Sequence, residues 1–326
     1  MAEQAVYISD IGYSLGSIRQ SVEQSYADGL TFSNAALLAK SGFQFHHMCR
    51  DNQSTYDLAS AAVDNLSSGA NTESGKSLQS IGGILYATCL TCNGNLGDWQ
   101  EFLDTRDVKH LMDFPVSHLQ ADLGMQNAFL MGINQIACTS LLSTLRVAKG
   151  LLCSDPNIGE LLCLTADRFP PGAAYEQTFN LISDGAAACV VNRNGGRFKI
   201  LDVHHISNGA MAQANDDETA GFYFNYSYRV ISELLSRNQL TLTDIHWIVP
   251  QNTNVKAWEV LASILRFDYE KVLTPTREDI GHCISGDNII NLKVMDDRGV
   301  FTSGEKILLP MAGFGLNWAC VLLEKV

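Results

Sequence analysis

The sequence has no long hydrophobic run, no leader-like N-terminus and little positive charge. No apolar stretch approaches the roughly 18 residues that a membrane-spanning helix needs, and the first residues are not typical of a signal peptide. The chain carries 22 lysine and arginine residues against 35 aspartate and glutamate residues, a formal net charge of −13. These absences argue against a membrane span and against nucleic acids or anionic membranes as partners.

The nine cysteines do not have the spacing of a disulfide framework. Because their number is odd and they are scattered, we expect reduced thiols and a cytoplasmic protein. Cys89 and Cys92 have the spacing of a redox pair or of half a zinc site, but no second pair completes a four-thiolate site, so buried strand positions are favoured. The two pairs of adjacent histidines would point to opposite faces of a strand. The sequence therefore predicts no metal site.

What the sequence does contain is an alternation of apolar strands and helices that runs through it twice. With 326 residues, 46% of them apolar and 17% charged, the chain has the composition of a compact globular protein. Periodicity predicts a first half, residues 1–195, with strands at 5–11, 81–88, 127–133, 160–166 and 186–192 and helices at 56–66, 114–123 and 140–152. It predicts a second half, residues 196–326, with strands at 198–204, 245–250, 271–274, 306–310 and 317–323 and helices at 222–236, 255–265 and 283–294.

The two halves end alike, in the apolar runs 185–191 and 317–323. Continuous apolar strands imply buried sheets, so we expect two similar sheets packed together. The segment 93–112 has no counterpart in the second half and is predicted to be an insertion, as is the polar loop 208–221.

Cys138 lies between a predicted strand, 127–133, and a predicted helix, 140–152, with the cap-type residues Thr139 and Ser140 beside it. The unpaired amides and the positive dipole end of a helix N-terminus favour a thiolate over a thiol. The position suits a reactive cysteine, although a small buried apolar residue is the commoner role of a free cysteine.

Three further strand-to-helix or strand-to-strand junctions fall at matching places in the repeat. They are Gln251, His282 and the glycine-rich turn 312–315. Because such sheets carry their sites at the carboxyl ends of strands, we expect these residues and Cys138 to meet in one pocket.

In this order and spacing, the landmarks of the chain resemble those of the thiolase-fold condensing enzymes, and among them 3-oxoacyl-ACP synthase III. The landmarks are Ala137-Cys138 before a helix, Ser183-Asp184-Gly185-Ala186-Ala187 before a strand, Ile248-Val249-Pro250, Gly281, and the terminal Ala312-Gly313-Phe314-Gly315-Leu316-Asn317-Trp318. The resemblance covers nearly the whole chain and implies a thiolase fold, in which two pseudo-symmetric mixed-sheet halves form five layers, α-β-α-β-α. It also implies a homodimer without a bound cofactor.

In that family a cysteine attacks the thioester of an acyl-CoA or an acyl carrier protein and holds the acyl group covalently. The resemblance gives this role to Cys138. It implies an oxyanion hole made by the backbone N–H of Cys138 and one from Gly313, Phe314 or Gly315. CoA or phosphopantetheine thioesters are then substrates.

The chain departs from the family at two catalytic places. Where the family has histidine, this chain has Gln251, and where it has asparagine, this chain has His282. At a helix N-terminus, His282 is expected to be neutral and able to accept a proton. Gln251 cannot act as a base, but its amide can donate to a carbonyl oxygen. Structural roles stay open for both, Gln251 as a helix cap and His282 as an ordinary helix-start residue.

Basic and polar residues near these junctions are weaker candidates for binding the substrate or a carrier protein. An acidic carrier needs a local basic patch on this acidic chain, although isolated basic residues on solvated faces are common. The candidates are Lys40, Arg146, Lys149, Asn254 and Lys256.

The resemblance implies an acyltransferase that loads Cys138 and condenses the acyl group with a malonyl-type thioester, in fatty-acid-like or specialised-metabolite (polyketide) biosynthesis. Two alternatives stay open. One is transfer to an oxygen or nitrogen nucleophile without decarboxylation, which suits His282. The other is a non-catalytic subunit of a heterodimeric synthase, against which the retention of Cys138 argues. The acyl chain length, the acceptor and the choice between CoA and carrier protein are not predicted.

Overall fold

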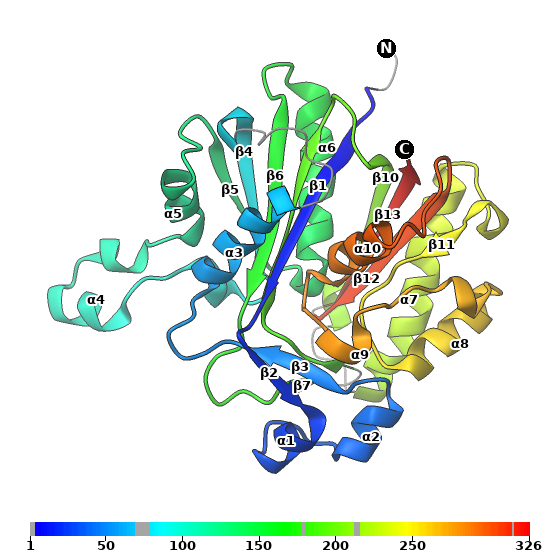
Figure 1. The fold of residues 1–326 in the computed structure, drawn as a ribbon, viewed down its shortest axis with the longest axis horizontal. Helices are drawn as coiled ribbons and strands as arrows, with labels where there is room; N and C mark the ends of the chain where they lie inside the picture. Colours follow the sequence, from blue (N-terminus) through cyan, green and yellow to red (C-terminus); the bar gives the residue numbers. More distant parts are fainter. Residues whose placement is uncertain (1–3, 69–77, 178–179, 212–215, 315) are drawn as a thin grey trace.

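The main strands of the protein form a mixed sheet that divides into two matching parts (Figure 1). The computed structural model describes residues 4–68, 78–177, 180–211, 216–314 and 316–326. The first part has the order β5-β4-β6-β9-β1 and consists of β1 (Tyr7–Leu15), β4 (Ile81–Ala87), β5 (Phe129–Ile133), β6 (Glu160–Asp167) and β9 (Gly185–Asn192). The second part has the order β11-β12-β13-β10 and consists of β10 (Phe198–Ser207), β11 (Trp247–Ile248), β12 (Lys306–Gly313) and β13 (Asn317–Lys325).

The two parts repeat the same pairing pattern. In each, a parallel pair, β4 with β6 or β11 with β12, is followed by two antiparallel neighbours. They meet where the start of β1 pairs with β10, at Tyr7 and Ile8. The boundary at residue 195 falls in the turn between β9 and β10, and the two units it defines stay a proposal.

Helices fill the space between the two parts and cover their outer faces. The outer face of the first part is covered by α3 (Thr55–Asp64) and α5 (Pro115–Asp122), and that of the second by α7 (Asp216–Arg237) and α8 (Val255–Leu265). The central helices α6 (Ser140–Ser154) and α10 (Asp287–Asp297) contact strands of both parts. The five layers expected of a thiolase fold are therefore confirmed.

The sequence of α6 explains its central place. Its apolar residues recur at helical spacing and are fully buried: Leu141, Leu142, Leu145, Ala148 and Leu152. They join the core cluster that also contains residues of β1, β10 and α10. This helix therefore packs against both parts of the sheet, and the turn before it lies deep in the molecule.

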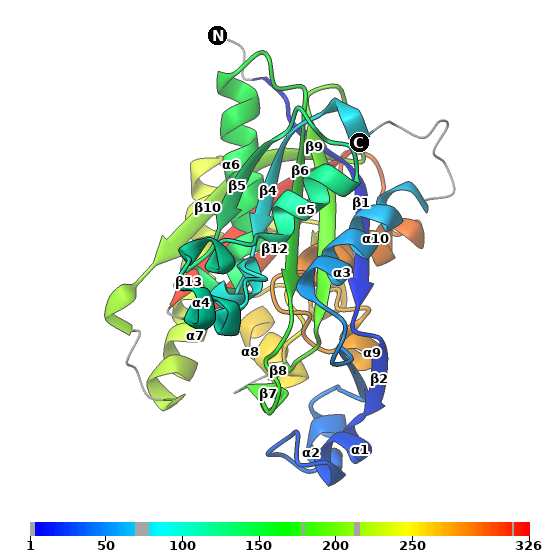
Figure 2. The ribbon, with the colours of Figure 1, turned by 90° about the vertical axis from the view of Figure 1, so that its left-hand side faces the viewer.

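A lobe that the periodicity does not predict lies at one end of the molecule, below the sheet in Figures 1 and 2. It contains β2 (Ile18–Ser21), α1 (Val22–Ala27), α2 (Ala35–Lys40), β3 (Phe45–Met48), β7 (Glu176–Gln177), β8 (Asn180–Leu181) and α9 (Arg277–Ile280). Its elements are only two to six residues long, too short to show a clear period.

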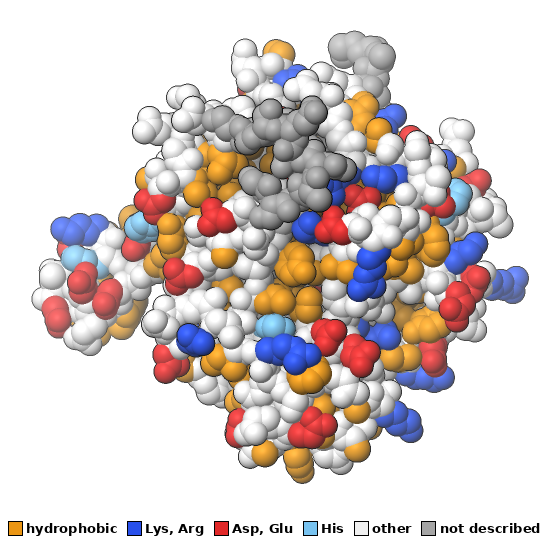
Figure 3. All heavy atoms as spheres, in the orientation of Figure 1, with side chains coloured by type: hydrophobic (Ala, Val, Ile, Leu, Met, Phe, Trp, Pro, Cys, Tyr) orange, Lys and Arg blue, Asp and Glu red, His pale blue; other side chains and the backbone are white. Residues whose placement is uncertain are grey.

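The predicted insertion 93–112 projects from the body as an arm that carries α4 (Trp99–Thr105), at the left of Figures 1 and 3. Its surface includes the exposed apolar side chains of Trp99, Val108 and Met112. The second predicted insertion, 208–221, is partly helical, because α7 already begins at Asp216, and its residues 212–215 lie outside the described residues.

Two predicted elements differ from the structure. The strand expected at 271–274 is a 3-10 turn, Tyr269–Lys271, followed by a single bridge between Val272 and Ile248. The helix expected from residue 283 begins only at Asp287, because Ile284 has a φ of 42°, outside the helical region, and the Cys283 N–H donates to the Asp287 side chain. No helix in the described part of the chain is long and apolar enough to cross a membrane.

Candidate active site

Cys138 lies in a 3-10 turn, Ala137–Thr139, that leads directly into α6. The preceding residue, Ala137, has a φ of 46°, in the left-handed region that non-glycine residues rarely adopt. Such strain persists only where the surrounding structure holds it, and it is common at functional sites. Cys138 is 9% exposed and lies on the wall of a cavity of about 380 Å³.

The cavity brings together the residues that the sequence places at separate junctions. Its wall includes Cys138, Gln251, His282, Gly313 and Phe314. Gly315 lies outside the described residues. The rest of the wall is largely apolar and includes Leu90, Phe169, Ile182, Tyr223, Ile284 and Leu316. A largely apolar cavity with a few convergent polar groups is typical of a small-molecule site.

His282 is held by backbone bonds to the lobe and not by a helix. Its N–H donates to the Leu181 carbonyl at 2.7 Å, and its own carbonyl accepts from Ser183 N–H at 2.9 Å. The turn before it needs glycine, because Gly281 has a φ of 71° and a Cβ there would lie 2.6 Å from the Leu181 oxygen. The prediction that His282 begins a helix is therefore wrong.

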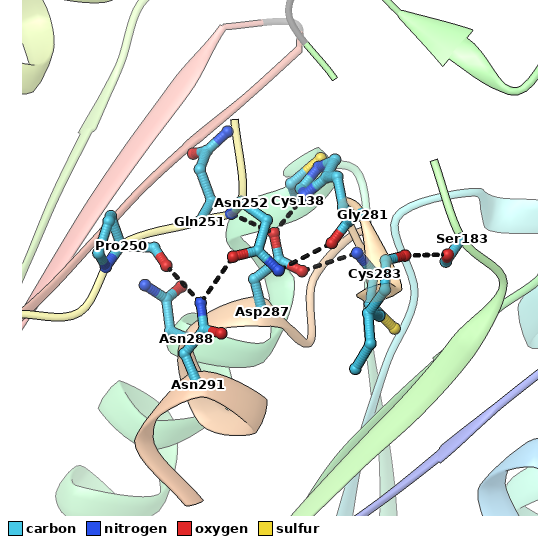
Figure 4. A network of polar contacts seen from close by, with 12 residues as sticks. Cys138, Ser183, Pro250, Gln251, Asn252, Gly281, Cys283, Asp287, Asn288 and Asn291 are labelled. Atoms are coloured by element: carbon cyan, nitrogen blue, oxygen red, sulfur yellow. Dashed lines mark hydrogen bonds and ion pairs between the residues drawn. The ribbon is translucent and has the colours of Figure 1, made fainter. Parts of the chain in front are cut away.

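Asp287, at the start of α10, binds the side chain of His282. The His282 Nδ1–H donates to Asp287 Oδ2 at 2.5 Å, and both side chains are almost fully buried. The carboxylate also accepts from the backbone N–H groups of Asn252 and Cys283, each at 2.7 Å (Figure 4). With three donors directed at it, Asp287 acts as the acceptor, so the proton of the hydrogen bond lies on Nδ1.

Sequence reasoning missed Asp287. An aspartate in the first turn of a predicted helix is usually explained by its favourable interaction with the helix dipole, so the pattern gives no reason to expect a catalytic role. The signal that could have found it is its spacing of five residues from His282, which is meaningful only once the intervening turn is known.

The charges of the site form a thiolate–imidazolium pair. The Cys89 thiol, which hydrogen-bonds the Cys138 sulfur, and then His282 lower the pKa of Cys138 to about 5, against the opposing effect of burial. Burial alone would lower the pKa of His282, but Asp287 and then Cys138 raise it to about 10. The expectation of a neutral His282 is thus wrong, since Asp287 outweighs any effect of a helix dipole.

Gln251 presents a hydrogen-bond donor to the cavity. Its Oε1 accepts from the backbone N–H of Ala312, in β12, at 2.5 Å, which orients the amide. No described residue accepts from Nε2. Beneath it, buried Asn252 and Asn291 connect the 250–252 loop to α10 through side-chain and backbone bonds (Figure 4). Gln251 therefore does not cap α8, whose cap is Asn254.

The end of β12 lies against the backbone of the nucleophile. A Cβ on Gly313 would be 2.8 Å from the Cys138 nitrogen, so only glycine allows this approach. This contact brings the predicted oxyanion-hole segment to the correct atom, and the oxyanion hole itself stays a proposal.

The weaker binding candidates do not line the cavity. Arg146 and Lys149 bind β10, through His205 at 3.4 Å and through the Leu201 carbonyl at 2.5 Å. Asn254 donates to Ser41 Oγ at 3.1 Å, next to Lys40 at the end of α2. Lys256 is exposed and pairs with Glu259. Lys40, Asn254 and Lys256 lie in neighbouring segments, whereas Arg146 and Lys149 lie on the central helix.

Cys89 and Cys92 are not the buried strand residues that the sequence favours. Cys89 follows the end of β4 and lines the cavity, with its Sγ 3.9 Å from Cys138 Sγ. Cys92 is exposed, in the 3-10 turn Thr91–Gly94. The strand ends earlier than predicted because Asp167 accepts the backbone N–H groups of Cys89 and Leu90. Among the described residues, no cluster could hold a metal ion.

Comparison with known proteins agrees with this geometry. A family described as 3-oxoacyl-[acyl-carrier-protein (ACP)] synthase III matches residues 133–209, and its C-terminal counterpart matches residues 235–325. The β-ketoacyl-[acyl-carrier-protein] synthase III of Ruegeria pomeroyi is 23% identical over 352 residues, which cover 99% of this chain and 100% of the relative.

Solved structures share the fold. The 3-oxoacyl-[acyl-carrier-protein] synthase III of Aquifex aeolicus superposes with a TM-score of 0.78 at 18% identity, covering 98% of this chain and 99% of that one. ChlB3, described as an acyltransferase, superposes with a TM-score of 0.81 at 20% identity, covering 99% and 98%. The matched family segments include Cys138, Gln251, His282 and Gly313, so the chain belongs to the 3-oxoacyl-ACP synthase III family of thiolase-fold condensing enzymes and is a transferase of that type.

Proposed function

We propose that the protein transfers an acyl group, through a thioester on Cys138, from CoA or an acyl carrier protein to a hydroxyl or amine acceptor. The observation that carries the proposal is the bond between His282 Nδ1–H and Asp287 Oδ2. A histidine oriented by a buried carboxylate beside a cysteine is the arrangement of a nucleophile with its base.

Loading starts from the thiolate–imidazolium pair. The Cys138 sulfur attacks the thioester carbonyl, and the oxyanion lies near the Cys138 N–H and the end of β12. The bond from the carbonyl carbon to the donor sulfur then breaks, and the departing thiolate takes the proton from His282 Nε2. The acyl group is now on Cys138, and His282 is neutral with its remaining proton held by Asp287.

Neutral His282 is a base in this tautomer. Its Nε2 has a free lone pair, so it accepts the proton of an acceptor O–H or N–H as that atom attacks the acyl carbon. The bond to Cys138 breaks, and the sulfur leaves as a thiolate beside the new imidazolium. This restores the starting charges without another reactant.

Condensation with a malonyl-type thioester is the second candidate, because the curated relatives are named β-ketoacyl-[acyl-carrier-protein] synthases. Decarboxylation needs donors to the developing enolate oxygen. Gln251 Nε2 is one donor, but after loading His282 Nε2 is an acceptor and cannot be the second without gaining a proton. The geometry therefore favours the hydroxyl or amine acceptor. A purely non-catalytic role is disfavoured, because nucleophile, base and orienting carboxylate are all present.

The test is the fate of the acyl-enzyme. The protein is incubated with a panel of acyl-CoA and acyl-carrier thioesters, and its intact mass is measured, with Cys138→Ala as the control. The loaded protein is then mixed either with malonyl-CoA or with primary alcohols and amines, and the loss of the acyl mass is followed against heat-denatured acyl-enzyme.

We expect a mass increase that Cys138→Ala lacks, and faster clearance of the acyl group by an alcohol or amine than by malonyl-CoA. Clearance by malonyl-CoA with a 3-oxoacyl product would overturn the proposed acceptor in favour of condensation. No adduct with any donor would overturn the acyl-enzyme itself.

A further inference from the structure

The catalytic cavity contains a second thiol directed at the nucleophile. Cys89 Sγ lies 3.9 Å from Cys138 Sγ, and both residues line the cavity. They come from separate segments, one after β4 and one before α6, so their proximity is a product of the fold. The mechanism above uses Cys89 only as a hydrogen-bond donor to the Cys138 thiolate.

We propose that Cys89 and Cys138 form a reversible disulfide, which makes the active-site cysteine a site of redox modification by hydroperoxides. A disulfide has an S–S bond of about 2 Å, so the two sulfurs need to approach by roughly another 2 Å. Both cysteines lie in turns at the cavity wall and not inside strands, which allows side-chain rotation toward each other.

Other cysteines of the chain do not offer the same combination. Cys163 and Cys189 are directly paired on β6 and β9, but both are fully buried in the sheet and out of reach of an oxidant. Cys92 is exposed, and its thiol is free in the described structure. The pair in the cavity combines a close second thiol with a space that a small peroxide can enter.

The reaction balances with a hydroperoxide as the oxidant. The Cys138 thiolate attacks the peroxide and breaks its O–O bond, which leaves a sulfenic acid on Cys138 and releases hydroxide or an alkoxide that takes up a proton to become water or an alcohol. The Cys89 sulfur then attacks the sulfenic sulfur, and the S–S bond forms as water leaves with the Cys89 proton. A dithiol reductant returns both thiols by thiol–disulfide exchange.

The site explains why the second step follows the first. In the reduced protein, the hydrogen bond to Cys138, burial and the Cys138 charge raise the pKa of Cys89, so this thiol keeps its proton. Oxidation of Cys138 to a neutral sulfenic acid removes its negative charge. The His282 imidazolium, which acts on the Cys138 sulfur, remains in the site and can stabilise the Cys89 thiolate that attacks.

The disulfide would protect the nucleophile from irreversible oxidation. Without Cys89, the sulfenic acid would persist in the cavity and react with more peroxide to a sulfinic acid, which thiol reductants do not reverse. An acyl group on Cys138 would block the first step, so the loaded protein would resist oxidation.

The experiment compares the wild type with Cys89→Ser, and with Cys92→Ser as a matched control from the same segment. Each protein is treated with hydrogen peroxide and then with dithiothreitol. Intact mass and peptide mapping identify the products, and iodoacetamide labelling of Cys138 measures the free nucleophile. These readouts do not depend on the acceptor or on transfer, so the test is separate from that of the proposed function.

In the wild type and in Cys92→Ser, we expect the loss of two hydrogen atoms, a peptide that links Cys89 to Cys138, and full recovery of labelling after reduction. In Cys89→Ser, we expect the gain of two oxygen atoms on Cys138 and no recovery. The inference is overturned if the linked peptide does not form, or if Cys89→Ser recovers as completely as the wild type.

Discussion

The ionisation of Cys138 depends on side chains that come from three parts of the fold: Cys89, His282 and, through His282, Asp287. Because the pKa of Cys138 is lowered to about 5 and that of His282 is raised to about 10, the reactive ion pair is populated between these two values. A thiolate is the nucleophile, so reactivity rises as the pH rises through the lower value.

We therefore predict that iodoacetamide alkylates Cys138 with a midpoint near pH 5 in the wild type, because the fraction of thiolate limits the rate. In His282→Ala, the midpoint moves up toward that of an ordinary thiol, because the positive partner is lost. Peptide mass spectrometry isolates the rate of the Cys138 peptide from those of the exposed cysteines. Identical midpoints in the two proteins would contradict the ion pair.

Gln251 allows a second test at this scale. Gln251→His is predicted to raise the decarboxylation of malonyl-CoA several-fold, because a protonated ring adds a charge-assisted N–H donor in place of the neutral amide, a gain of about 1 kcal/mol. Released carbon dioxide is the readout. Gln251→Ala, which also removes the native amide, serves as the control, and an equal effect of both substitutions would rule out the added donor as the cause.

The sequence predicted the position of single residues where these residues belong to a recognisable motif. Cys138, Gln251, His282 and Gly313 reach the same cavity as expected. The charge of His282 was not predictable, because it depends on Asp287, which approaches only through the turn between them. The position of Cys89 was not predictable either, because it depends on Asp167, whose carboxylate accepts the Cys89 backbone N–H just after the end of β4.

At the scale of elements, the contact between β12 and the turn before α6 decides the geometry of the site. Gly313→Ala is predicted to slow loading of Cys138 by about 10²- to 10³-fold, the effect of losing one oxyanion-hole donor, because its Cβ would displace the Cys138 amide. The rate of acyl-enzyme formation, measured by intact mass, checks this.

Gly150→Ala is the matched control for that substitution. Gly150 lies in α6, the helix that follows Cys138, and a Cβ there meets no atom. Alanine should stabilise the protein by roughly 0.5 to 1 kcal/mol, the ordinary difference between the two residues inside a helix, and leave loading unchanged. Urea unfolding measures the stability. A comparable loss of loading in Gly150→Ala would show that the Gly313 effect is not local.

Helices and strands were predicted correctly where the periodic segment is long, and wrongly where tertiary hydrogen bonds override the periodicity. Helix α8 has the predicted bounds, Val255–Leu265, since its apolar stripe and the Asn254 cap agree. The start of α10 was misplaced because His282 bonds to Leu181 and Ser183 and Ile284 takes a positive φ. The lobe of short strands and helices was missed for lack of periodicity.

At the scale of the whole molecule, β5 is an unpaired edge of the sheet in the described structure. Its residues Leu130 and Met131 are exposed, at 37% and 38%. Exposed apolar edge strands commonly pair with another chain. We propose that two copies join along β5, which would make the expected homodimer.

We predict that Met131→Glu shifts the protein from dimer to monomer in sedimentation, because a charge would be buried at the joined edges. Ile264→Glu, at an exposed position of α8 on the second half, is the control and should stay a dimer. A wild-type protein that sediments as a monomer, or a Met131→Glu variant that stays dimeric, would contradict the proposed edge.

The role of His282 and Asp287 is decided by the rate at which an amine or alcohol acceptor clears the acyl group from Cys138 in Asp287→Asn. Protein loaded to the same extent is compared with the wild type and with Asp297→Asn, a half-exposed aspartate at the other end of α10. Circular dichroism verifies that each variant is folded.

We predict that clearance falls by about 10²- to 10⁴-fold in Asp287→Asn, since an asparagine no longer fixes the tautomer or stabilises the imidazolium, and that Asp297→Asn is unchanged. Clearance by Asp287→Asn at the wild-type rate would contradict the assignment of His282 and Asp287 as the base of the transfer.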